Sequence, residues 1–181
     1  AIKDLLRRAT RAAGGNTSAK LHARLLEAGA RSALAAGNAA QALEQARAAV
    51  ERATSGNLPD ARVSASLAAC ECLLAAGGSP AAGGAQTESS KTDSLLEAAG
   101  LATQAADVAR AHGLAEGTWQ AFAVLAEIER RAGRRAAGLR HLAGAAEILE
   151  QTARGIADEA IRTAYLAEPR RADLIRSAAI L

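Results

Sequence analysis

Residues 115–154 read AEGTWQAFAVLAEIERRAGRRAAGLRHLAGAAEILEQTAR, with a helical pattern on each side of Gly133. Apolar side chains recur every three or four positions in both halves, which predicts one helix over 115–132 and another over 135–154. Trp119 and Phe122 are the only large aromatic side chains of this pair. We expect Phe122 in the core and Trp119, one turn earlier, half exposed. The stretch therefore predicts a helical hairpin.

The composition extends this prediction to the whole chain. The 181 residues include 52 alanines, but only one Trp, one Tyr, one Phe and no Met. Because alanine is the strongest helix former, the protein should be mostly helical. The shortage of aromatic and β-branched residues excludes a β-sandwich or barrel. Three prolines exclude a collagen-like chain, and the 50% hydrophobic share excludes a disordered one.

Glycine, asparagine and proline divide the chain into helices that come in pairs. A Gly/Ser/Pro/Ala-rich stretch at 77–91 has no apolar periodicity and is predicted to be a flexible loop. The predicted helices span 2–13, 19–36, 39–54, 59–76, 92–111, 115–132, 135–154, 156–166 and 170–181.

The first helices of three pairs end at similar glycines, which indicates an internal repeat. Gly37 and Gly77 are 40 positions apart, and Gly77 and Gly133 are 56 apart. The longer interval contains the loop 77–91, whose removal restores a period near 40. Stacked hairpins bury the apolar stripes that no pair can bury alone. Six small residues are expected to let the helices approach closely: Ala30, Ala42, Ala49, Ala126, Gly138 and Ala145.

The pair 119–146 resembles a tetratricopeptide repeat (TPR). The residues that carry the resemblance are Phe122, Leu125-Ala126 and Gly133 in the first helix and turn, and Gly138-Leu139, Leu142 and Ala145 in the second helix. The pair 23–50 lacks the aromatic residues and matches less well. The period is longer than the usual one and is similar to that of repeats in bacterial signalling and regulatory proteins. The resemblance implies an all-α fold, an α-solenoid of antiparallel helical hairpins wound as a right-handed superhelix.

We therefore expect one TPR-like domain over 1–181. It would consist of a partial repeat at 1–15, hairpins at 19–54, 58–111 and 114–154, and capping helices at 156–181.

The resemblance also implies that the first helix of each hairpin lines a concave groove. Arginines there could bind the carboxylates of an acidic peptide, whereas cations near helix C-termini are favourable without any partner. Both interpretations stay open for the arginines. Ser64 and Glu71 would lie on the same face in the second hairpin. The predicted partner-binding residues are Arg24, Glu27, Arg31, Gln120, Glu127, Arg130 and Arg131.

The residues that usually carry chemistry are scattered. His22, His112 and His141 fall in different elements, and no spacing matches a metal site or a nucleophile–base pair. Cys70 and Cys72 face different sides of a helix and are expected to be reduced. Arg170-Arg171 is expected to be exposed at a turn. We expect no enzymatic activity and no cofactor or metal.

These observations predict a non-catalytic protein–protein interaction or scaffold module that docks a partner peptide or helix in its groove. One alternative is a nucleic-acid-binding helical repeat that uses the basic cluster between Arg130 and Arg140. Another is a cis-regulatory sensor domain of a multidomain protein.

The chain has no apolar run of roughly 18 residues, so we expect no membrane span and a cytoplasmic location. Because it does not begin with Met, we expect a fragment of a larger signalling or regulatory protein.

Overall fold

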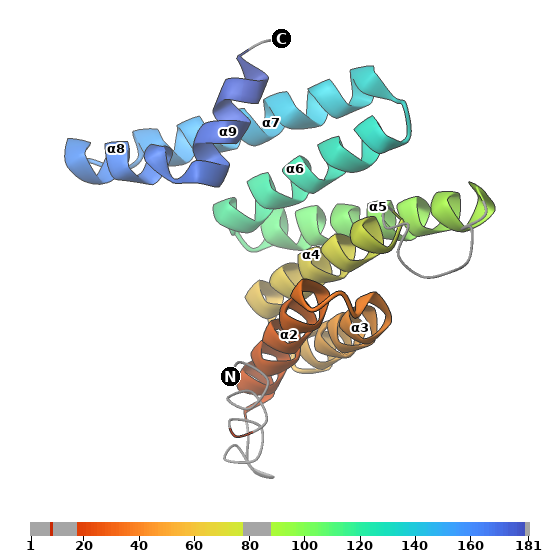
Figure 1. Ribbon diagram of the computed structural model, residues 1–181. Coiled ribbons are helices and arrows are strands. Elements are labelled where there is room, and N and C mark those ends of the chain that lie inside the picture. The colour runs from red at the N-terminus through yellow and green to blue at the C-terminus, as the bar shows by residue number, and fades with distance from the viewer. Residues whose placement is uncertain (1–7, 9–17, 78–87, 180–181) are drawn as a thin grey trace. The chain divides into compact units, whose positions relative to one another are not determined.

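The computed structural model describes Arg8, residues 18–77 and residues 88–179, and the regular secondary structure of these residues is entirely α-helical (Figure 1). The all-α fold class is confirmed for this part of the chain. Its helices are α2 (Ala19–Ala35), α3 (Ala39–Ser55), α4 (Pro59–Ala76), α5 (Glu88–Ala111), α6 (Ala115–Arg131), α7 (Arg135–Arg154), α8 (Glu159–Ala167) and α9 (Pro169–Ala178).

Most helix ends lie within one or two residues of their predicted positions. Two starts differ. The helix α5 begins at Glu88, inside the predicted loop, where Ser94 Oγ donates a hydrogen bond to the Ser90 carbonyl oxygen one turn earlier. The helix α8 begins at Glu159 because Asp158 caps it, accepting from Ile161 N at 2.9 Å. The predicted helix 2–13 falls outside the described residues except for Arg8, and so does most of the predicted loop.

Four of the turns between helices share one backbone geometry. Gly37, Gly113 and Gly133 have φ of 79°, 65° and 74°, and Asn57 has φ of 49°. In each case the next residue donates its N–H to the carbonyl five positions earlier, as Arg134 does to Glu129 at 2.8 Å. This left-handed residue with its 6→1 hydrogen bond is a Schellman-type helix end. Gly77 differs from the others, since its φ is −69°.

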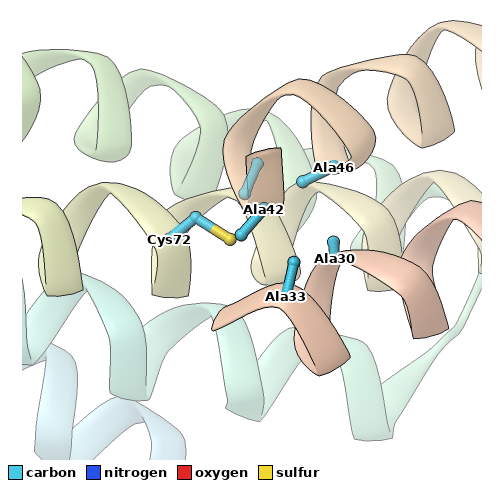
Figure 2. Packing of buried hydrophobic residues seen from close by; sticks show 6 residues of the cluster. Ala30, Ala33, Ala42, Ala46 and Cys72 are labelled. Atoms are coloured by element: carbon cyan, nitrogen blue, oxygen red, sulfur yellow. The ribbon is translucent and has the colours of Figure 1, made fainter. Parts of the chain in front are cut away.

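The helices form two compact units, with the boundary between Ala105 and Ala106 inside α5. In the first unit α2 packs against α3, and both pack against α4. Its core is made largely of alanine: Figure 2 shows Ala30, Ala33, Ala42 and Ala46 gathered around Cys72, all 3% exposed or less. Side chains this small let the helices lie close together, which fits the alanine-rich composition.

The second unit is built on the α6–α7 hairpin, against which α9 packs through α7. Its core contains Trp119, Ala145, Ala146, Leu149 and Leu174. All six small residues expected at close helix approaches are buried, three in each unit.

The burial of the two aromatic residues of α6 is the reverse of what we expected. Trp119 is only 4% exposed because Leu174 of α9 belongs to the same buried cluster. Phe122 is half-buried at the edge of that cluster, with the Arg110 guanidinium 4.5 Å from its ring centroid and the His141 ring 5.9 Å away. The expectation of a half-exposed Trp119 is therefore wrong, since α9 covers it.

None of the described helices combines the length and the apolar character that a bilayer-spanning helix needs.

Candidate partner-binding surfaces

A buried carboxylate ties α2 to α4 in the first unit. Glu27 is 4% exposed and accepts hydrogen bonds from Arg24 Nη1 at 3.0 Å, from Arg31 Nη1, and from Ser64 Oγ of α4 at 2.5 Å. A buried charge is stable only when it is paired and hydrogen-bonded, and Glu27 has both kinds of partner. Three predicted groove residues thus come together, and they bind one another.

The network continues toward solvent along α4. Arg31 Nε lies 3.6 Å from Glu71 Oε2, and Arg24 Nη2 lies 3.6 Å from Asp60 Oδ2. Lys20 Nζ is 2.8 Å from the same Asp60 oxygen, and its hydrogen bond is the main cause that lowers the pKa of Asp60. The arginines of this face are therefore already paired with carboxylates of the protein itself.

A second charged group lies on α6, and Glu127 is at its centre. Arg130 donates to both Glu127 oxygens at 2.7 Å, and Arg131 Nε donates to Oε1 at 2.6 Å. The hydrogen bond from Arg130, followed by that from Arg131, lowers the pKa of Glu127 to about 2. Gln120, the remaining predicted residue of this helix, donates to Glu116 at 3.1 Å instead.

The α6–α7 hairpin has a pocket of about 500 Å³, which we call the hairpin pocket. Most of its lining is apolar or backbone, and Glu127 and Arg130 form part of one wall. Volumes of this size are typical of concave binding sites. The lining residues are Ala123, Ala126, Glu127, Arg130, Gly133, Arg135, Gly138, Leu139, Leu142 and Ser177.

The arginines around the hairpin pocket differ in how they are paired. Arg134 is bound to Glu129, and that hydrogen bond is the main cause lowering the pKa of Glu129. Arg130 is bound to Glu127. The side chain of Arg135, which is exposed and lines the pocket, forms no hydrogen bond or ion pair with any residue in the described part of the chain. Its guanidinium at the pocket is therefore unpaired as far as the described residues go.

A third cluster, which our sequence reasoning missed, joins the end of the chain to α6. Arg171 Nη2 donates to Glu116 Oε1 at 2.9 Å, and its guanidinium lies 4.0 Å from the centroid of the Tyr165 ring. The Arg171 side chain is only 19% exposed, so the expected exposure is wrong for Arg171 and confirmed for Arg170, and both residues lie in the first turn of α9 and not in a turn between helices. The cause is the contact with α6, which the local sequence does not reveal.

The two cysteines are free and buried on α4, which is covered on most of its circumference. Burial raises the pKa of Cys70 to about 12, and its Sγ lies 3.3 Å from the Ala98 carbonyl oxygen. Burial also raises the pKa of Cys72. Neither thiol is positioned as a nucleophile. Within the described ranges no three His, Cys, Asp or Glu side chains are grouped to hold a metal ion.

Comparison with family models, curated proteins and solved structures finds no match to this chain. The assignment of a function therefore depends on the surfaces themselves.

Proposed function

We propose that this chain is a protein–protein interaction module, built as a TPR-like α-solenoid of helical hairpins, that binds a segment of a partner protein. The hairpins α2–α3 and α6–α7, one in each unit, share the same Schellman-type turn and the same use of buried small residues. These similarities support a repeat. The free, buried thiols suit a reducing compartment such as the cytoplasm.

The observation that carries the proposal is the hairpin pocket. It brings Glu127 and Arg130, two of the predicted partner-binding residues, to the edge of an apolar hollow. Arginine beside apolar surface is typical of the residues that dominate protein interfaces. The predicted residues of the first unit support the proposal less directly, because Glu27 holds Arg24 and Arg31 in place.

Nucleic-acid binding has weaker support. Arg130, Arg131 and Arg134 are bound to Glu127 or Glu129, which reduces their attraction for phosphate. Phe122 lies between Arg110 and His141 and so offers a restricted stacking surface.

The test begins with the complete chain immobilised as bait and the captured protein identified and purified. The dissociation constant of that purified protein is then measured by calorimetry with the wild type and with an Arg130→Ala/Arg131→Ala variant. We expect the variant to bind at least about tenfold more weakly, because interface arginines often contribute more than 1.4 kcal/mol. The matched control is Arg140→Ala/Arg154→Ala, which removes two exposed arginines of α7 outside the pocket lining. Equal weakening by both variants would contradict the proposal.

A further inference from the structure

The hairpin pocket continues a surface that already accepts a helix. Leu174, Ile175 and Ala178 of α9 pack in the cluster formed by Trp119 and Leu142. Ser177, on the same helix, lines the pocket, and so does Leu142. The groove between α6 and α7 is thus covered by α9 along one part and left open along the next.

The open part of this groove has the surface that a second helix needs. The small residues Ala123, Ala126 and Gly138 are part of its lining, and side chains this small let another helix approach closely. Leu139 and Leu142 are half-buried and present apolar side chains to the pocket. An amphipathic helix buries its apolar face in a groove of this kind.

The charge at the pocket favours a bound helix of the opposite charge. Arg135 is unpaired among the described residues, whereas Glu127 is neutralised by Arg130 and Arg131. The net charge that is free to act on an incoming helix is therefore positive. A basic helix would be repelled by Arg135, and a carboxylate beside it would form a charge-assisted hydrogen bond.

We propose that the hairpin pocket binds an acidic amphipathic helix of the partner protein, with aliphatic side chains against Leu139 and Leu142 and a carboxylate on Arg135. This inference rests on the proposed function and adds to it the chemistry of the partner. The bound helix would lie beside α9, on the same groove.

The probe for this inference is a synthetic peptide of about 14 residues, roughly four helical turns, with leucines at i, i+3, i+7 and i+10 and glutamates and alanines elsewhere. A matched peptide carries lysine in place of every glutamate. Each is titrated into ¹⁵N-labelled complete chain and followed by NMR. We expect the acidic peptide to give saturable shifts at Ala126, Gly138 and Leu139, and the basic peptide to give none there.

Two variants and a control locate the binding. Arg135→Glu should weaken binding of the acidic peptide at least tenfold and strengthen binding of the basic peptide. Leu139→Ser should weaken binding of the acidic peptide, which should still bind better than the basic one. Arg140→Glu changes an exposed arginine of the same helix outside the lining and should leave the affinity within about twofold. Thermal unfolding by circular dichroism verifies that each variant is folded.

The inference is overturned if the shifts fall elsewhere, if both peptides bind equally, or if Arg140→Glu has the effect of Arg135→Glu. It is also overturned if analytical ultracentrifugation shows that the wild-type chain self-associates and that Leu139→Ser abolishes this self-association, because a second copy of the chain would then fill the pocket. The partner captured above separates the two proposals. A dissociation constant sensitive to Arg130→Ala/Arg131→Ala but not to Arg135→Glu refutes only this inference, and insensitivity to both refutes the proposed function as well.

Discussion

The carboxylate of Glu27 on α2 accepts a hydrogen bond from the hydroxyl of Ser64 on α4 at 2.5 Å, across 37 positions of sequence. The same carboxylate binds Arg24 and Arg31 of its own helix. A charged side chain that is only 4% exposed therefore connects two helices, in a unit whose core is made largely of alanine. Its position makes it part of the fold first and of any binding surface only through the arginines that it orients.

Replacing this carboxylate should destabilise the first unit. We expect Glu27→Ala to lower the free energy of unfolding by about 2 kcal/mol, because the hydroxyl of Ser64 loses its acceptor and Arg24 and Arg31 each lose one of their two carboxylates. Urea unfolding followed by far-ultraviolet circular dichroism measures the change. Glu51→Ala, at an exposed position of α3, is the control and should stay within about 0.5 kcal/mol of the wild type. Similar losses in both variants would mean that the Glu27 network adds nothing to stability.

The aromatic residues of α6 should differ in their contribution to stability. Trp119 is buried under α9, so we expect Trp119→Ala to cost about 4 kcal/mol. Phe122 is half-buried, with Arg110 over its ring and His141 beside it, so Phe122→Ala should cost less than Trp119→Ala. Urea unfolding by circular dichroism suits the comparison, since the first variant has no tryptophan. A larger loss for Phe122→Ala would contradict the burial of Trp119.

The ion pairs of Glu127 should give this carboxyl a distinct acid titration. Its pKa is about 2 in the folded protein against an ordinary 4.5, chiefly because Arg130 and then Arg131 donate to the carboxylate. The folded pKa is the lower one, so the stabilisation is complete above the ordinary value and is lost as pH falls from about 4.5 toward about 2.

Carbon-detected NMR of the Glu127 carboxyl checks this titration. We expect a midpoint near 2 in the wild type and in Arg140→Ala, and a clear rise toward 4.5 in Arg130→Ala/Arg131→Ala. An unchanged midpoint in the double variant would show that the arginines do not hold the carboxylate in solution.

Much of the helix pattern could be predicted from the sequence because its signals are local. Gly37, Gly113 and Gly133 adopt the left-handed conformation that ends a helix, and their positions alone locate three turns. The small residues were expected at helix contacts for a similar reason, since their spacing follows the helical period. Ala49 and Ala145, at equivalent places in two hairpins, are both fully buried.

The contacts of α9 could not be predicted in the same way. Leu174 of α9 completes the buried cluster around Trp119, and Arg171 of α9 binds Glu116 of α6. No local sequence pattern indicates that α9 returns to the α6–α7 hairpin. The candidate site shows the same limit. The resemblance to a tetratricopeptide repeat selected Glu127 and Arg130 together, but it gave no sign that Glu127 pairs with Arg130. Nor did it indicate that Arg135 lines the pocket without a partner among the described residues.

Two glycines in helices should respond in opposite directions to the same substitution. A Cβ on Gly138 would lie 3.1 Å from the Ala126 carbonyl oxygen, a backbone atom of α6 that can retreat only if the hairpin opens. A Cβ on Gly100 of α5 would meet nothing within 4 Å. Alanine is favoured over glycine in a helix by about 1 kcal/mol. At Gly100 this preference is the only effect of the substitution, whereas at Gly138 the cost of overpacking outweighs it.

We therefore expect Gly100→Ala to raise the free energy of unfolding by about 0.5–1 kcal/mol and Gly138→Ala to lower it by about 1 kcal/mol. Urea unfolding of both variants under one set of conditions measures the two changes. Because the substitution is the same, the difference in sign isolates the close contact of α7 with α6. Stabilisation of both variants would show that the hairpin accepts a methyl group at Gly138, and that the small-residue contact assigned to this position does not limit the packing.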